Sequence, residues 1–241
     1  MPIWLTELSA DPKIFPDPRK ALKSPDGLLA MGGDLSPARL IHAYQHGIFP
    51  WFNHDDPLLW WSPSIRAVFT PNSLQLSRSL RKTLKKHNFS FSCNKKFHEV
   101  MALCAQTRQQ TTGTWIQPCM QQAYGELHQL GVAHSIEVWS DDTLVGGCYG
   151  LQIGSLFCGE SMFNLVPNAA KFALIMLQYH LSRYTDGLID CQMPNPFLMQ
   201  MGATPLPKSD YLVLLSDRRD WSVPNDMWQP RTLNWPSEEP N

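Results

Sequence analysis

The pattern of hydrophobic and polar positions divides the chain into a proline-rich first part and a second part with longer elements. Prolines interrupt the first sixty residues and leave room only for short elements joined by turns; they include Pro12, Pro16, Pro18, Pro25, Pro37, Pro50 and Pro57. One helix is predicted here. Ser36 suits the N-cap, Pro37 suits the first helical position, and Gly47 ends the pattern.

A second helical pattern begins at Ser77 or Ser79 with the run SRSLRKTLKKH. Its leucines recur every four residues, which places them on one helical face and the basic residues on the others; these leucines are Leu76, Leu80 and Leu84. A third helix is predicted over residues 118–130, before Gly131.

Beyond Gly131 the pattern indicates short strands followed by a longer helix. Strands are expected over residues 134–139 and 143–149, over 151–158 after a glycine turn, and over 188–192, with an amphipathic helix over 168–184. Antiparallel strands that precede a crossover helix predict an α+β (mixed α/β) fold.

The length of 241 residues favours two unequal domains. We expect a small N-terminal α+β domain over residues 1–64 and a larger catalytic domain over 65–241. The irregular tail beyond Pro224 predicts an extended strap that packs on the larger domain and ends in a loose terminus.

Composition limits the class of protein. Hydrophobic residues make up 43% and charged residues 17% of the chain, which excludes general disorder. The start MPIWLTELSADP has no basic region followed by an apolar one, and no stretch approaches the roughly 18 apolar residues of a membrane span. We therefore expect a cytoplasmic protein that does not contact a membrane. Its six cysteines lack C-x-x-C spacing and are expected to be free, mostly buried thiols.

Basic residues gather in one stretch although the net charge is only −1. Between Pro57 and His98 there is no Asp or Glu, whereas a merely solvated surface would mix signs. The stretch predicts contact with nucleic-acid phosphates. The alternative is that these basic residues only form a solvent-exposed helix face without a ligand. The candidate phosphate-binding residues are Arg66, Arg78, Arg81, Lys82, Lys85 and Lys86.

Two other pairs of residues are candidates for a metal-binding or a catalytic site. His42 and His46 have the helical spacing of a metal pair, but they lack nearby Cys or carboxylate partners, so no metal site is predicted. Cys158 and Cys191 have no adjacent histidine that would activate a thiol, which favours a structural role.

Eight ordered segments resemble the leucyl/phenylalanyl-tRNA–protein transferase family. Any one of them would be weak evidence, but their order and spacing extend over nearly the whole chain. The segments are PDGLLAMGGDLSPARL (25–40), GIFPWF (47–52), LLWWSPSIRAVF (58–69), GTWI (113–116), HSIEVW (134–139), LVGGCYG (144–150), FCGESMF (157–163) and LIDCQ (188–192). The chain departs from the family at Cys148, where methionine is familiar, and at Ala170 and Pro196.

The resemblance implies an aminoacyltransferase whose larger domain has the GCN5-related acetyltransferase fold. The donor would be an aminoacyl-tRNA that carries Leu or Phe, with Met as a further option. The acceptor would be a protein that begins with Arg or Lys, which the modification marks for N-degron-dependent degradation. No cofactor is implied, the basic residues would contact tRNA, and we expect a monomer.

An aminoacyl ester is already activated, so its aminolysis needs positioning and proton removal but no covalent nucleophile. Asp190 and Gln192 lie two residues apart, which would place them on the same face of a strand. In the resembling family the matching aspartate and glutamine are proposed to act on the amine; here Gln192 would orient it and Asp190 would supply a negative field. Alternatively, both satisfy buried backbone groups at a strand end.

Glu160 is the second candidate carboxylate and follows a predicted strand. It would pair with the cationic side chain of the acceptor that the resemblance implies. The alternative is a helix N-cap or an exposed turn residue.

The donor side chain requires an apolar, partly aromatic pocket. The candidates are Trp51, Trp115, Cys148, Phe157, Leu174, Leu177 and Ile189, and simple core packing is the alternative for each. Trp51 and Trp115 are favoured because they lie in loop-like contexts. The small Cys148 is expected to enlarge the pocket.

Two other functions stay open at this point. One is an acetyl-CoA-dependent N-acetyltransferase of the same fold, although the sequence after Gly150 continues as a strand rather than as a pyrophosphate loop. The other is a non-catalytic RNA-binding module whose apparent site residues are structural.

Overall fold

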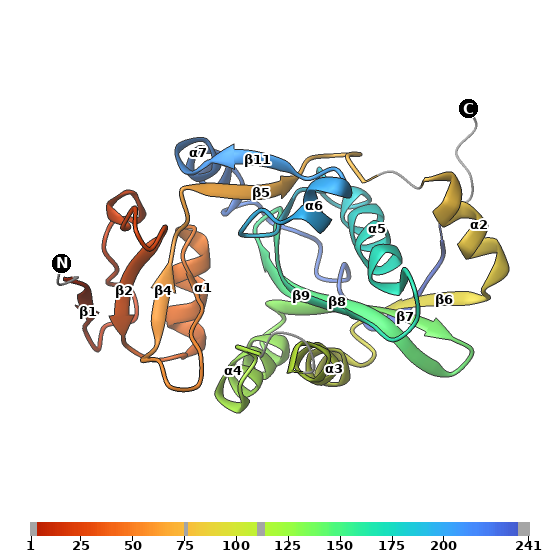
Figure 1. The fold of residues 1–241 in the computed structure, drawn as a ribbon, viewed down its shortest axis with the longest axis horizontal. Helices are drawn as coiled ribbons and strands as arrows, with labels where there is room; N and C mark the ends of the chain where they lie inside the picture. The colour runs from red at the N-terminus through yellow and green to blue at the C-terminus, as the bar shows by residue number, and fades with distance from the viewer. Residues whose placement is uncertain (1–3, 75–76, 110–113, 236–241) are drawn as a thin grey trace.

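The chain forms a small sheet near its N-terminus and a larger sheet flanked by helices, as the computed structural model shows (Figure 1). The structure describes residues 4–74, 77–109 and 114–235, except the side chain of Lys85. Among these residues, no helix combines the length and the apolar character that crossing a membrane requires.

The small sheet has the strand order β1-β2-β4-β3. Its strands are β1 (Thr6–Leu8), β2 (Leu28–Gly32), β3 (Phe49–Pro50) and β4 (Leu59–Trp61). A short 3-10 helix, Pro18–Lys20, and helix α1 (Pro37–Gln45) connect them. The predicted start of α1 is confirmed, because Ser36 is the N-cap and Pro37 opens the first turn.

The large sheet has the order β11-β5-β10-β9-β8-β7-β6-β12. Its strands are β5 (Ile65–Phe69), β6 (Phe89–Cys93), β7 (Ala133–Ser140), β8 (Thr143–Ile153), β9 (Leu156–Asn164), β10 (Ile189–Asp190), β11 (Thr204–Pro207) and β12 (Arg231–Leu233). Strand β10 is parallel to β9 and antiparallel to β5. The mixture of helices and sheets confirms the α+β class, while likeness to the acetyltransferase fold stays a prediction.

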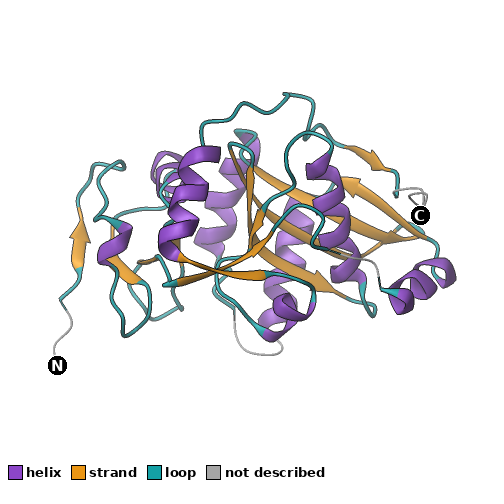
Figure 2. Cartoon of the chain, turned by 90° about the horizontal axis from the view of Figure 1, so that it is seen from above, coloured by secondary structure: helices purple, strands orange, loops and turns teal. Residues whose placement is uncertain are grey.

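Helices cover both faces of the central strands (Figures 1 and 2). On one face lie α3 (Phe97–Gln109) and α4 (Pro118–Gln129), and on the other α5 (Ala169–Ser182). The remaining helices are α2 (Arg78–Lys86), α6 (Pro196–Gln200) and α7 (Lys208–Arg218). The predicted helices at 77, 118 and 168 are therefore confirmed, whereas the sequence pattern did not reveal α3 or α7.

The predicted turn at Gly150 is wrong. Strand β8 continues through Gly150 to Ile153, and the turn comes at Gly154, where φ is +58°. Gly150 instead allows close strand packing, since a Cβ there would lie 2.1 Å from the carbonyl oxygen of Cys158.

The tail lies along the large sheet, where β12 pairs with β6. Met227 and Trp228 are buried, and the indole of Trp228 stacks on His134 at 4.4 Å and tilts against His180 at 4.8 Å. Burial lowers the pKa of His134 to about 3 and that of His180 to about 4. Both imidazoles are therefore neutral near pH 7 and suited to packing against an indole.

The small sheet ends at Trp61 and the large sheet begins at Ile65. One continuous apolar core nevertheless joins the two parts, because Leu40 and Tyr44 of α1 belong to the same buried cluster as Tyr124 of α4. The division into domains at residues 64 and 65 stays a prediction.

Candidate functional site

A buried ion pair joins the strand β10 to its neighbour β5. Arg66 Nε donates to Asp190 Oδ1 at 3.1 Å, and Arg66 Nη2 donates to Asp190 Oδ2. Tyr211 of α7 donates its hydroxyl to Oδ2 at 2.9 Å, and the backbone N–H of Gln192 donates to Oδ1 at 2.9 Å. Both carboxylate oxygens of Asp190 are therefore engaged within the protein.

The surroundings of Arg66 keep it charged. Burial opposes the charged form, but the combined effects of Asp190 and Tyr211 outweigh it and raise the pKa of Arg66. Its guanidinium also donates to the carbonyl of Gly47 at 3.2 Å and lies 4.3 Å from the ring centroid of Tyr211. The expectation that Arg66 belongs to an exposed phosphate-binding face is wrong, because only 1% of it is exposed.

The strand-alternation argument for Asp190 and Gln192 is also wrong. Strand β10 ends at Asp190, and Gln192 adopts the left-handed conformation with φ of +62°. The chain therefore turns between the two residues, so a period of two does not apply. Asp190 holds the backbone of Gln192, whose side chain extends to Glu160.

Glu160 lies at an irregularity in strand β9. Tyr149 pairs with Ser161 and Gly150 pairs with Gly159, which leaves Glu160 as the extra residue of a β-bulge. Such bulges redirect a side chain, and here the carboxylate is buried. The alternative that Glu160 is an exposed turn residue or a helix cap is therefore wrong.

The Glu160 carboxylate accepts hydrogen bonds from three side chains of different elements. Tyr44 of α1 and Gln192 Nε2 each donate to Oε1 at 2.6 Å. Tyr124 of α4 donates to Oε2 at 3.2 Å, and its hydroxyl lies 2.5 Å from that of Tyr44.

Burial raises the pKa of Glu160 to about 7, although the hydrogen bonds from Tyr44 and Tyr124 act in the opposite direction. A carboxyl group with this pKa exchanges a proton near neutral pH. A buried, titrating carboxylate is typical of a catalytic acid or base.

A cavity of about 280 Å³ opens beside Glu160. Strand β10 pairs with β9 at Phe157 and Cys158, and the cavity lies along the next part of β9. Its walls are Arg108, Cys148, Tyr149, Phe157, Gly159, Glu160, Ser161, Met162, Leu174, Leu177, Ile189, Cys191, Asn195, Phe197 and Leu198. The cavity is thus mainly apolar, with a few polar groups on its walls.

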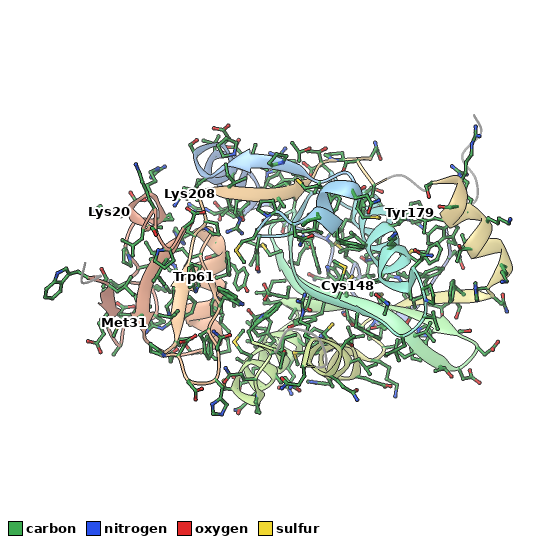
Figure 3. The ribbon with its side chains drawn as sticks, viewed as in Figure 1. Lys20, Met31, Trp61, Cys148, Tyr179 and Lys208 are labelled. Carbon is green, nitrogen blue, oxygen red and sulfur yellow. The ribbon has the colours of Figure 1, made fainter. Side chains whose placement is uncertain are left out.

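Five predicted pocket residues line this cavity: Cys148, Phe157, Leu174, Leu177 and Ile189. Figure 3 shows Cys148 within the large part of the molecule and Trp61 within the small part. Trp51 is not among the lining residues and packs against Trp61, with ring centroids 5.3 Å apart. Trp115 lies 4.2 Å from the guanidinium of Arg108, which itself lines the cavity.

Sequence reasoning missed several residues of this region. Arg108 donates from Nε to Ser161 at 2.9 Å, and Tyr44, Tyr124 and Tyr211 surround the two carboxylates. The tyrosines lie in helices, where the apolar periodicity describes them as core residues. Their hydroxyl groups are explained only by the structure, in which they donate hydrogen bonds to the buried carboxylates of Glu160 and Asp190.

The basic helix α2 lies at the end of the molecule opposite the small sheet (Figure 1). Its N-cap is Ser77, whose side chain accepts a hydrogen bond from the backbone N–H of Leu80. Leu80 is buried and Leu84 is half-buried, while Leu76 lies outside the described residues. Arg78, Arg81, Lys82 and Lys86 are exposed, and the side chain of Lys85 is outside the described part.

Metal and thiol chemistry find little support here. Within the described residues no group of three or more His, Cys, Asp or Glu side chains could hold a metal ion. Burial raises the pKa of Cys158 and Cys191 well above its usual value, which favours the unreactive thiol.

Comparison with known proteins gives consistent matches. A family model described as leucyl/phenylalanyl-tRNA protein transferase matches residues 68–216, and a model of the N-terminal domain of the same family matches residues 33–64. The chain is 55% identical over 224 residues to a leucyl/phenylalanyl-tRNA–protein transferase of Shewanella piezotolerans, which covers 93% of this chain and 95% of that protein. A protein of the same name from Tolumonas auensis is 51% identical, over 97% of this chain and 99% of that protein.

The buried ion pair generates a stability prediction. Asp190→Asn keeps the shape of the side chain but leaves Arg66 as an uncompensated buried charge, so we expect the free energy of unfolding to fall by about 3 kcal/mol in urea denaturation. Combining Asp190→Leu with Arg66→Met removes both charges and should be less destabilising than Asp190→Asn.

The matched control is Asp186→Asn, which breaks a 2.8 Å pair between Arg218 and Asp186 whose side chains are 25% and 27% exposed. We expect it to cost less than about 1 kcal/mol. Equal losses for Asp190→Asn and Asp186→Asn would contradict a special role for the buried pair.

Proposed function

The chain belongs to the leucyl/phenylalanyl-tRNA–protein transferase family, and we propose that aminoacyl transfer takes place in the cavity beside Glu160. The enzyme is an aminoacyltransferase that moves a leucyl or phenylalanyl group from aminoacyl-tRNA to a protein. The acetyl-CoA and non-catalytic alternatives are set aside, since neither agrees with relatives that match over nearly the whole chain.

The observation that carries the proposal is the contact between Glu160 and Gln192. Gln192 Nε2 donates to the Glu160 carboxylate at 2.6 Å. The amide oxygen of Gln192 is then available to accept a hydrogen bond from an incoming amine. Glu160, whose pKa is about 7, is basic enough to receive a proton, whereas an amide is not.

The reaction follows from these two roles. The acceptor nitrogen attacks the ester carbonyl, and its proton passes to Glu160. The bond from the carbonyl carbon to the ribose oxygen of the tRNA then breaks, and that oxygen takes up the proton. Holding amine and ester together supplies much of the acceleration, since the ester needs no further activation.

Asp190 has a different role in this scheme. Its oxygens already accept from Arg66, Tyr211 and the backbone of Gln192. We assign it as a positioning residue that fixes the turn carrying Gln192. This role differs from direct contact with the attacking amine.

The substrates are proposed in finer detail from the family. We propose that acceptors begin with Arg or Lys, that the modification leads to their degradation, and that the enzyme acts as a monomer. We also propose that α2 contacts the phosphates of the tRNA, because its exposed cations repeat at helical spacing.

A pH profile tests the role of Glu160. Glu160→Gln should lower the single-turnover rate of leucyl transfer to an Arg-initiated peptide at least a hundredfold. In the unmodified enzyme the rate should rise with pH through about 7, where Glu160 loses its proton. Tyr44→Phe removes a hydrogen bond that favours the carboxylate, so it should shift this rise to higher pH.

The amine of the peptide also titrates, near pH 8, but equally in every variant. Tyr179→Phe is the matched control, since this helix α5 residue does not line the cavity, and its profile should be unchanged. If Glu160→Gln raised only the KM for Arg-initiated peptides, Glu160 would bind the acceptor cation and would not be the base.

Donor preference depends on the volume beside Cys148. Cys148→Met adds atoms to a wall of the 280 Å³ cavity, so kcat/KM should fall about tenfold for phenylalanyl-tRNA and less for leucyl-tRNA. Cys119→Met is the control because Cys119 is exposed on α4. Unchanged ratios for the two donors in Cys148→Met would place the donor side chain elsewhere.

Binding of tRNA tests α2. The double variant Arg78→Gln, Lys82→Gln should weaken tRNA binding and reduce the slope of log affinity against log salt by about two, one per lost phosphate contact. The control Lys20→Gln, Lys23→Gln removes the same charge from exposed positions of the small part. Equal effects of both double variants would indicate a general charge effect.

A further inference from the structure

A second and larger cavity, of about 570 Å³, lies against helices α1 and α7. Tyr44 of α1 and Tyr211 of α7 contact Glu160 and Asp190, whereas other residues of the same helices line this cavity. The segment over residues 13–19, which runs into the short 3-10 helix, forms a further wall. The second cavity is therefore distinct from the one beside Glu160, with which it shares no lining residue.

Basic groups dominate the polar part of its lining. They come from three separate parts of the chain: Lys13 and Arg19 from the segment over residues 13–19, His42 from α1 with His46 directly after it, and Arg219 directly after α7. The one acidic lining residue, Asp17, interacts with Arg19 at 3.5 Å. Among the lining residues, the three permanent cations Lys13, Arg19 and Arg219 therefore outnumber the single carboxylate, which favours an anionic ligand.

The two histidines pack against each other, and His42 interacts with Lys13 and Arg219. Their ring centroids are 4.2 Å apart, and His46 Nδ1 lies 2.7 Å from the backbone oxygen of His42. Burial lowers the pKa of His42, and the charges of His46, Lys13 and Arg219 lower it further, against a small opposing effect of Asp11. A bound anion would reverse this repulsion and stabilise the protonated imidazole.

The rest of the lining is apolar and partly aromatic. Phe15 stacks near His42 with an interplanar angle of 26°, and Ile48, Leu212 and Leu215 also line the cavity. A cavity of this volume, with apolar walls and a few charged groups, has the usual character of a small-molecule site. The flat surfaces of Phe15 and His42 suit a ligand with a planar ring.

We propose that this cavity binds a small phosphomonoester with a planar ring system, of the nucleoside monophosphate class. The phosphate would lie among Lys13, His42 and Arg219, and the ring would lie against the apolar wall. Arg219 already donates to the carbonyl of Gln45 at 3.0 Å and lies 3.7 Å from Asp220. Its guanidinium has further N–H groups for a phosphate.

Binding should depend on pH in a defined direction. The ligand gains its second negative charge near pH 6, whereas the lowered pKa of His42 means that its imidazole becomes positively charged only as pH falls. The charged groups that face His42 are His46, Lys13, Arg219 and Asp11. The contribution of His42, measured as the ratio of affinities of the unmodified chain and Lys13→Gln, His42→Gln, should therefore be larger at pH 6 than at pH 8.

Isothermal titration calorimetry on the full chain tests the proposal, with adenosine 5′-monophosphate as the probe. At pH 6 we expect it to bind at least tenfold more tightly than inorganic phosphate or adenosine alone. The double variant Lys13→Gln, His42→Gln should weaken binding at least tenfold, while Lys20→Gln, Lys23→Gln should not. Retained leucyl transfer by the double variant verifies its fold.

Two outcomes would overturn the proposal. One is probe binding that Arg108→Gln abolishes and Lys13→Gln, His42→Gln does not, which places the nucleotide in the cavity beside Glu160. The other is absence of probe binding together with weakened tRNA affinity in Lys13→Gln, His42→Gln, which assigns the basic cluster to the tRNA backbone.

Discussion

The buried pair of Arg66 and Asp190 is the constraint on which the site depends. Arg66 comes from β5 and Asp190 from β10, and the pair also contacts Tyr211 of α7 and the carbonyl of Gly47 after α1. A buried guanidinium without these partners would cost several kcal/mol. The small sheet, α7 and the strand that precedes Gln192 must therefore assemble together, and their assembly fixes where Gln192 lies.

The sequence predicted the elements whose signals are local. Ser36 with Pro37 and the serine before Arg78 fixed helix starts because capping involves neighbouring residues. Three cavity residues, Cys148, Phe157 and Ile189, lie in resembling segments, and Leu174 and Leu177 lie in the predicted helix over residues 168–184. The prediction of a turn at Gly150 was wrong because glycine serves two purposes that the sequence does not distinguish. It allows a turn, and it also allows close packing between strands, which is its role here.

The misplaced site residues depended on contacts between distant segments. Arg66 belongs to the basic stretch by composition, but its strand position places it beside Asp190, which is 124 residues away. Gln192 lies in a left-handed conformation that no strand pattern would reveal. Glu160 is turned inward by a bulge whose position depends on pairing with β8. These features depend on tertiary contacts, so they could not be predicted from the residues next to each position in the sequence.

The ion pair also affects the chemistry of Glu160. Arg66 lowers the pKa of Glu160 and Asp190 raises it, so the two charges of the pair act in opposite directions on this carboxyl group. Desolvation has the largest effect and raises the pKa, while the hydrogen bonds from Tyr44 and Tyr124 oppose it. An unpaired Arg66 would make Glu160 a weaker base. Asp190 can therefore influence proton transfer without touching the substrate, because it offsets the lowering of the Glu160 pKa by Arg66.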